Sequence, residues 1–200
     1  MTKKAAFDIG NVLCHVDLKT FFQYLVDAGF ATHVREGEEF FSGIQCPMDL
    51  GLFTVAQGFY KFNPRLTKPQ LKDLGKVWAD VVIPSEPMMG VLDKALSQGY
   101  EVALLSNIGH DHGAVVRDKC KIFSKCNQHF SYEVGARKPT KLFYQSFAMQ
   151  YGWPNDVMFF DDRQDNVDSA SLYFKGIKFD IETYKDDTIA ARYIRSMLDI

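Results

Sequence analysis

Short apolar runs, each followed by a polar residue, constrain this chain more than any other feature. The polar residues that follow them are Asp8 after residues 5–7, Ser106 after 101–105, Asp161 and Asp162 after 157–160, and Asp180 after 176–179. Runs of this length without alternation between polar and apolar residues are typical of strands buried on both faces of a parallel sheet. The sequence therefore predicts several such strands.

Helical patterns separate these strands. Residues 88–98 end at Gly99, a residue type that commonly terminates helices. Residues 139–151 begin with proline and end at Gly152, and residues 184–198 place their apolar side chains on one face. Strands that alternate with helices predict an α/β fold with a doubly wound, mostly parallel, Rossmann-like sheet.

The interval after the first strand is much longer than a crossover between parallel strands requires, which is a dozen or more residues. Two apolar stripes at helical spacing lie within it: Leu18, Phe21, Phe22, Leu25 and Val26, and then Leu71, Leu74, Val77, Trp78 and Val81. We find no β alternation there. Residues 17–86 are therefore predicted to form a small α-helical cap domain, inserted into a core domain of residues 1–16 and 87–200.

Ligands of open parallel sheets bind beyond the carboxyl ends of the strands. If the strands are neighbours, Asp8, Ser106, Asp161 and Asp162 converge there. Clustered carboxylates repel one another unless a cation or protons hold them together. Mg²⁺ suits such a site because it binds a few carboxylates together with water and a phosphate. A single Asp could instead cap a helix, but the recurrence at several strand ends favours a shared site.

Four segments in order resemble the motifs of the haloacid dehalogenase superfamily of aspartyl-nucleophile hydrolases. They are FDIGNVL at residues 7–13, LLSN at 104–107, GARKP at 135–139 and FFDDRQDNV at 159–167. The position of the predicted helical cap, between the first and second segments, is similar to that in capped members. The GNV after Asp8 also resembles a subgroup that includes glucose-1-phosphate phosphatase.

This resemblance implies a nucleophile and a metal site. Asp8 would attack phosphorus and form an aspartyl-phosphate that water then hydrolyses. Mg²⁺ would be held by Asp8, Asp162 and the backbone carbonyl of Gly10. Asp161 would be a further ligand or would support the others.

The same resemblance assigns the phosphate-binding residues. Ser106, the backbone amide of Asn107, and Lys138 would hold the oxygens of the transferring phosphoryl group, whose charge needs fixed donors and cations. Lys138 would also be catalytic. We expect Asp165 and Asn166 to shape their loop and cap the following helix.

Gly10 departs from the pattern of most phosphatases of this superfamily, which carry there a second Asp that protonates the leaving group. A positioned general acid contributes about 10²–10⁴-fold in rate. Its absence matters least when the leaving oxygen is weakly basic. We therefore hypothesise a preference for such leaving groups, with Asp17, His15 or water supplying a proton. Asp17 also precedes a helical stripe, where an N-cap role is expected.

The predicted function is a Mg²⁺-dependent phosphatase that acts on a small phosphorylated metabolite, either a sugar phosphate or a nucleotide-like compound. One alternative is a metal-independent hydrolase of the haloacid dehalogenase type, against which the two adjacent acids Asp161 and Asp162 argue. Another is a binding or regulatory module with little turnover, an alternative that Gly10 leaves open.

Composition excludes several other classes of function. A net charge of −2 and a pI near 6.2 provide no general attraction to nucleic acid or to an anionic membrane. No segment reads as a signal peptide or a membrane span, so a cytoplasmic location is expected. Cys120, Cys126 and His129 lack the spacing of a zinc site, and His110 and His112 read as loop or helix-start residues. The oligomeric state stays open.

Overall fold

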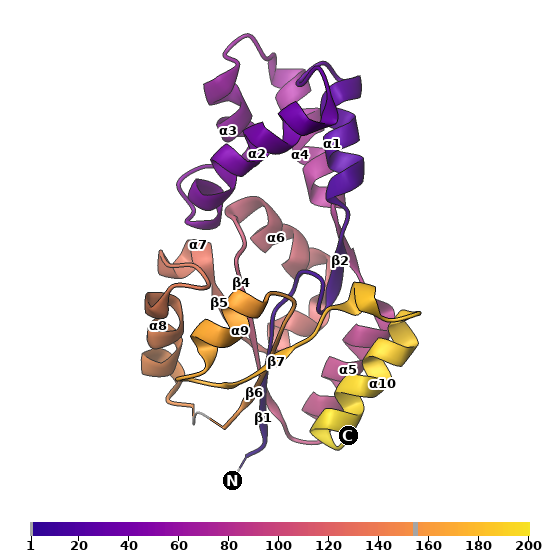
Figure 1. The fold of residues 1–200 in the computed structure, drawn as a ribbon, viewed down its shortest axis with the longest axis vertical. Coiled ribbons are helices and arrows are strands. Elements are labelled where there is room, and N and C mark those ends of the chain that lie inside the picture. Colours follow the sequence, from indigo (N-terminus) through magenta and orange to yellow (C-terminus); the bar gives the residue numbers. More distant parts are fainter. Residues whose placement is uncertain (1, 154–155) are drawn as a thin grey trace.

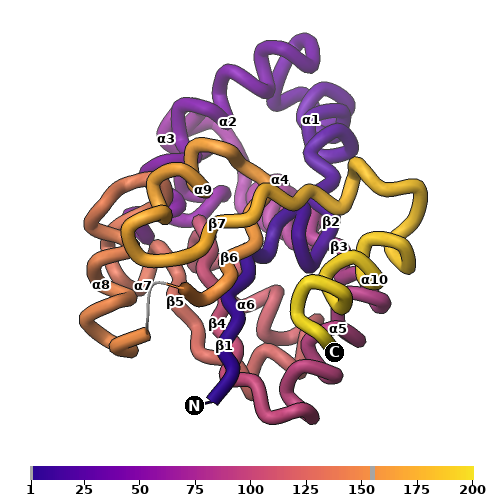
Figure 2. Tube along the Cα trace, turned by 60° about the horizontal axis from the view of Figure 1, so that its bottom comes forward, coloured from indigo at the N-terminus to yellow at the C-terminus, as the bar shows by residue number. Residues whose placement is uncertain are grey.

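A five-stranded sheet forms the centre of the computed structural model, which describes residues 2–153 and 156–200. All four pairs of neighbouring strands are parallel. Across the sheet the strands are β5 (Asn127–Phe130), β4 (Glu101–Ser106), β1 (Lys4–Phe7), β6 (Met158–Asp161) and β7 (Lys175–Lys178). Strand β1 therefore lies in the middle, with β4 and β6 on its two sides (Figure 2).

Helices cover both faces of this sheet (Figure 1). Phe7 faces α5 (Glu86–Ser97) and α10 (Asp187–Leu198) in one apolar cluster. Ala6, the preceding residue, faces α8 (Lys141–Tyr151) and α9 (Gln164–Ala170) in another. Successive residues of a strand point to opposite faces, so β1 needs apolar side chains at both positions. The predicted α/β fold with a parallel, doubly wound sheet is confirmed.

Shorter elements connect the strands. Helix α6 (His110–Lys119) follows β4, α7 (Ser131–Val134) follows β5, and the 3₁₀ helix Ile181–Thr183 follows β7. The 3₁₀ helix Lys121–Lys125 precedes β5 and leads the chain into it.

Four helices after β1 form a separate layer beyond the carboxyl ends of the strands, shown at the top of Figure 1. We call them the helical layer: α1 (Leu18–Asp27), α2 (Val34–Asp49), α3 (Val55–Phe62) and α4 (Lys68–Asp80). The layer has its own apolar cluster, in which Phe21, Phe41 and Trp78 pack with ring centroids 4.9–5.9 Å apart. A cluster of this kind lets the layer bury its apolar stripes without the sheet.

The first turns of these helices are stabilised locally. Asp17 is the N-cap of α1, as expected, and accepts the Thr20 N–H at 3.0 Å. Helices α3 and α4 each begin with a Thr–Gln capping box, in which side chain and backbone groups satisfy each other. The starts of these three helices are thus set by capping residues that can be read in the sequence.

Two short strands, β2 (Cys14–Val16) and β3 (Val82–Pro84), form an antiparallel ribbon between the sheet and the helical layer. We expected no strand between residues 17 and 86, and β3 shows this to be wrong. A strand of three residues is too short to display alternation, and its partner is distant in the sequence. No helix in the described ranges has the length and apolarity needed to cross a membrane.

Candidate active site

Two neighbouring strands bring the predicted carboxylates together. Phe7 of β1 lies opposite Phe160 of β6, so the residues that follow them, Asp8 and Asp161, are side by side at the carboxyl edge of the sheet. The Asp8 N–H continues the pairing by donating to the Phe160 carbonyl at 2.8 Å. Asp8, Asp161 and Asp162 each offer a carboxylate oxygen within 4.8 Å of the others. This set of oxygens could hold a divalent cation.

Lys138 lies among these carboxylates and is only 1% exposed. Its Nζ is 2.9 Å from Asp8 Oδ1 and 2.6 Å from Asp161 Oδ2, and it donates to the Leu105 carbonyl at 2.7 Å. Lysine is rarely buried without a charged partner, and Lys138 has two, Asp8 and Asp161. These ion pairs bring residues from three of the four motif segments into one site.

Ser106 is the last residue of β4 and Asn107 follows it, and their side chains make different contacts. The Asn107 side chain is bonded to the backbone of Lys138: its Oδ1 accepts the Lys138 N–H at 2.7 Å, and its Nδ2 donates to the Lys138 carbonyl at 2.8 Å. The side chain of Asn107 therefore positions Lys138. Ser106 is buried and borders the cavity described below.

The two adjacent acids differ in how far the protein already satisfies them. Asp161 Oδ1 accepts the Arg163 N–H and the Asn166 Nδ2–H, both at 2.9 Å, while its Oδ2 faces Lys138. Asp162 is half-buried and, from the residues described in the structure, its side chain accepts one bond, of 3.2 Å from Asn11 Nδ2. Asp162 therefore has more capacity left for a cation than Asp161.

Asn166 does not have the role that we expected. It lies inside α9 instead of capping it, is buried, and donates its side-chain amide to Asp161. Asp165 is exposed and pairs with Arg163 at 2.8 Å. The capping interpretation fails because the helix begins before both residues, which places them in its first turn.

Burial and charge together make this cluster electronegative. Burial raises the pKa of Asp8 to about 7, with Asp161 and Asp162 acting in the same direction and Lys138 opposing them. Burial also raises the pKa of Asp162. For Lys138, desolvation alone would lower the pKa, but Asp8 and Asp161 outweigh it and the pKa is raised. Three acids around one ammonium group leave an excess of negative charge that a cation would neutralise.

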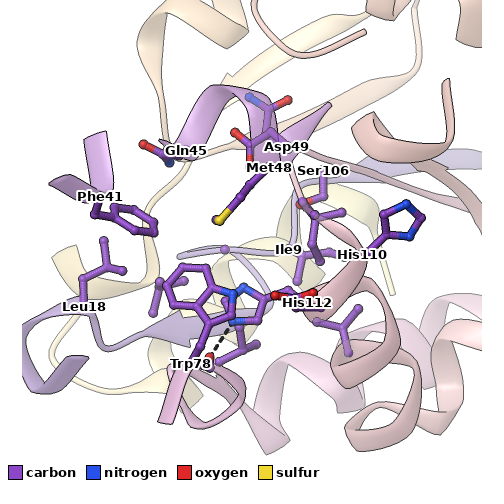
Figure 3. Close-up of a pocket in the computed structure, with 18 of the residues that line it drawn as sticks. Ile9, Leu18, Phe41, Gln45, Met48, Asp49, Trp78, Ser106, His110 and His112 are labelled. Atoms are coloured by element: carbon purple, nitrogen blue, oxygen red, sulfur yellow. Dashed lines mark hydrogen bonds between the residues drawn. The ribbon is translucent and has the colours of Figure 1, made fainter. Parts of the chain in front are cut away.

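A cavity of about 120 Å³ lies between this edge of the sheet and the helical layer (Figure 3). From the sheet side it is bordered by Ile9, Gly10, Ser106 and Asn107. Asp8 does not border it, although the two residues that follow Asp8 in the chain do. From the helical layer come mainly apolar side chains, among them Leu18, Phe41, Met48, Phe53 and Trp78. The polar cluster and the apolar cavity therefore meet at the turn after β1.

The two histidines after β4 belong to this cavity and not to the carboxylate cluster. His110 is the first residue of α6, as expected. His112 is buried, stacks on the Trp78 ring at 4.0 Å, and its Nε2 lies 2.6 Å from the Trp78 carbonyl (Figure 3). Burial lowers the pKa of His112 to about 4, so it is neutral at physiological pH. His112 thus joins α6 to α4.

The expected proton donors lie elsewhere. His15 is paired with Glu182 and, at 2.9 Å, with Asp187, and Asp17 caps α1. His15 and Asp17 do not border the cavity, whereas Asp49 does. Sequence reasoning missed Asp49, the last residue of α2, because nothing in its local sequence separates it from the other acids of that helix.

Solved structures similar in fold to this chain include enzymes of the HAD family. Profiles of protein families give no match to the chain. A HAD family enzyme from Bacteroides thetaiotaomicron, solved with magnesium and inorganic phosphate, is 23% identical over 90% of this chain and 94% of its own, with a TM-score of 0.74. Two other structures match at 14% identity over 99% of this chain. They are a HAD phosphatase from Thermococcus onnurineus (98% of its chain, TM-score 0.69) and an L-2-haloacid dehalogenase from Xanthobacter autotrophicus with covalently bound chloropropionic acid (84%, 0.62).

Proposed function

We propose that this protein is a Mg²⁺-dependent phosphatase that hydrolyses a small phosphate monoester through an aspartyl-phosphate on Asp8. The observation that carries the proposal is the arrangement around Asp8. Its carboxylate is 2.9 Å from a buried lysine and shares the carboxyl edge of the sheet with two further acids. Phosphoryl transfer needs a nucleophile, cations and fixed donors around the phosphoryl oxygens, and these residues supply each of them.

The donor set suits Mg²⁺. Carboxylate oxygens of Asp8 and Asp162 and the backbone carbonyl of Gly10 would hold the ion, while Asp161, whose two oxygens are engaged by Lys138, Arg163 and Asn166, would support the site. When bound, the ion would neutralise charge on the carboxylates and on the phosphoryl group.

Asp8 would attack phosphorus with its carboxylate oxygen, and the bond from phosphorus to the leaving oxygen would break. Lys138 would hold a phosphoryl oxygen with its ammonium group, together with the Ser106 hydroxyl and the Asn107 backbone amide. Lys138 is suited to this task because Asp161 and Asn107 fix its head group and its backbone. Preorganised donors of this kind stabilise the charge that develops in the transition state.

The helical layer, as part of a cap of residues 17–86, would enclose the leaving group. The cavity of about 120 Å³ is small beside the ~300–1,000 Å³ of common ligand sites. Its walls from the helical layer are mainly apolar. These features favour a small leaving group, and a nucleotide would require the helical layer to move away.

Dehalogenation is the second candidate, since a dehalogenase shares the fold. A nucleophile that works without metal would have to ionise next to Asp161 and Asp162, which both raise its pKa. The cluster therefore favours the metal-dependent reaction. A binding module with little turnover is the third candidate, and it differs from both enzymes in releasing no product.

A phosphate-release screen tests the proposal. Small phosphate esters are incubated with the protein and Mg²⁺, with EDTA in parallel, and beside them the Asp8→Asn variant. The proposal predicts release that requires Mg²⁺ and is lost in the variant. Release that survives in Asp8→Asn, or no release from any ester, would contradict it.

A further inference from the structure

The turn after β1 has no group that could protonate a leaving oxygen. Position 10 is glycine, and a Cβ placed there would lie 3.2 Å from Val16 Cγ2. Val16 therefore occupies the space next to this position. A proton donor for the leaving group has to come from another part of the cavity wall.

Two carboxylates line the cavity within the described part of the chain, Asp49 and Asp111. Asp111, on α6, is engaged: its Oδ2 accepts the Val55 N–H at 2.8 Å and so attaches α3 to the α/β part. Asp49 is different. It is 5% exposed, and its Oδ2 makes no hydrogen bond with any described group.

Asp49 is held near the phosphate-binding residues by Arg137. The Arg137 Nη2 is 3.0 Å from Asp49 Oδ2, and Arg137 directly precedes Lys138, whose charge also acts on Asp49. The pair is close but not aligned as a hydrogen bond, and Arg137 Nε, which is buried, also has no partner among the described residues. Arginine–carboxylate pairs are frequently joined by two parallel bonds, and this pair is not, which leaves Asp49 Oδ2 without a hydrogen bond among the described groups.

The protonation of Asp49 also suits a donor. Burial raises its pKa to about 6, although Arg137 and Lys138 lower it. General acids work best when their pKa lies near the operating pH.

We propose that Asp49, which reaches the cavity from the helical layer, is the general acid of the reaction. This inference rests on the proposed phosphatase function. As the bond between phosphorus and the leaving oxygen breaks, its electron pair stays on that oxygen, which takes the proton of the Asp49 carboxyl group. In the second step the Asp49 carboxylate takes a proton from water. The water oxygen then bonds to phosphorus, and the Asp8 carboxylate leaves.

The test compares leaving groups in the Asp49→Asn variant. Asparagine has the same shape but cannot donate this proton. The kcat/KM for glycerol phosphate, with a strongly basic leaving oxygen, should fall about 10²–10³-fold, within the range of general-acid contributions. The kcat/KM for p-nitrophenyl phosphate should change little. The plot of log(kcat/KM) against leaving-group pKa for a series of esters should therefore be shallow in the wild-type protein and steep in the variant. The preference for weakly basic leaving oxygens that Gly10 suggests from the sequence should then appear only in the variant.

Asp111→Asn is the matched control, because it removes the other carboxylate of the cavity. It loosens the attachment of α3 and should lower the rate for all esters by a similar factor, leaving the slope unchanged. Thermal unfolding of all three proteins checks that they fold.

Equal loss for all esters in Asp49→Asn would overturn the assignment and leave Asp49 as a contact between helical layer and sheet. In that case the phosphatase would stand, provided that Asp8→Asn is inactive. A wild-type protein that releases phosphate from no ester would overturn both proposals.

Discussion

Asp161 shows how one residue can support a site through others. It is fully buried, and it holds Lys138 on one oxygen and receives Asn166 and the Arg163 N–H on the other. These bonds fix the orientation of the Asp161 carboxylate and of the Lys138 ammonium group beside Asp8. We therefore expect a residue that contacts Asp161, such as Asn166, to affect catalysis through the orientation of Asp161.

Asn166→Ala tests this expectation. The variant removes the amide that orients Asp161, and loss of such an outer partner typically costs about 10–100-fold in metal affinity or activity. The Mg²⁺ concentration at half-maximal phosphate release should rise, or kcat should fall, by that factor. Gln164→Ala is the control, because Gln164 is exposed on the same helix and its side chain bonds to Asp168 and to no other residue that the structure describes. Equal behaviour of the two variants would contradict a role for Asn166 in the site.

The carboxylate cluster could be anticipated from the sequence because its acids stand at the carboxyl ends of two strands, Asp8 after β1 and Asp161 and Asp162 at the end of β6. The engagement of Asn107 with the Lys138 backbone and the position of Asp49 could not. Both depend on how segments 31 or more residues apart meet, and a local pattern carries no information on such contacts.

Among the elements, the contact of α6 with α4 depends on a neutral histidine. His112 has a pKa lowered from 6.5 to about 4 because it is buried. As the pH falls, His112 is therefore protonated in the unfolded chain, near pH 6.5, before it is protonated in the folded protein. The stability that neutral His112 contributes is therefore present above about pH 6.5 and is lost as the pH falls toward 4.

This loss should be on the order of 3 kcal/mol in the free energy of unfolding, from 1.36 kcal/mol per pKa unit. Denaturant unfolding at pH 7.5 and pH 4.5 measures it. His112→Gln, which keeps an N–H donor for the Trp78 carbonyl but does not titrate, should lose less stability on acidification. His110→Gln is the control, since His110 is exposed. If the stability of His112→Gln depends on pH in the same way as that of the wild-type protein, His112 is not buried as described.

Packing of α9 on β7 provides a second prediction at this scale. A Cβ at Gly176 would lie 2.8 Å from Val167 Cγ1 and 2.9 Å from the Val167 carbonyl oxygen, so Gly176→Ala has to displace α9. We expect a loss of about 1–3 kcal/mol in stability. Phosphate release should fall as well, because α9 carries Asn166.

Gly75→Ala is the control for this variant. Gly75 lies in α4 with open space around it, so alanine should stabilise the helix by about 0.5–1 kcal/mol. Chemical denaturation measures both changes. A Gly176→Ala variant as stable as the wild-type protein would contradict the close approach of α9 to β7.

The elements that the sequence predicted well are those buried on both sides. Strands β1, β4 and β6 read as apolar runs because helices cover both their faces. Strand β5, whose sequence is NQHF, was not predicted. It lies at the edge of the sheet, where polar side chains are tolerated, and so it has no apolar run.

At the scale of the whole molecule, the described residues form two apolar clusters in the α/β part and one in the helical layer. The candidate site lies between these two parts. The charged groups come from the carboxyl edge of the sheet, while most of the cavity wall comes from the helical layer. We therefore infer that the α/β part determines the reaction and the helical layer selects the leaving group.

A covalent phosphoryl group on Asp8 is the feature that distinguishes the proposed reaction from its alternatives. The protein is mixed with Mg²⁺ and a phosphate ester, the reaction is stopped in acid, and the peptide that contains Asp8 is analysed by mass spectrometry. We expect the mass of one added phosphoryl group on Asp8, present with Mg²⁺ and absent with EDTA or in Asp8→Asn. Phosphate release without any phosphoryl group on Asp8, or an ester formed on Asp8 from a 2-haloacid without metal, would contradict it.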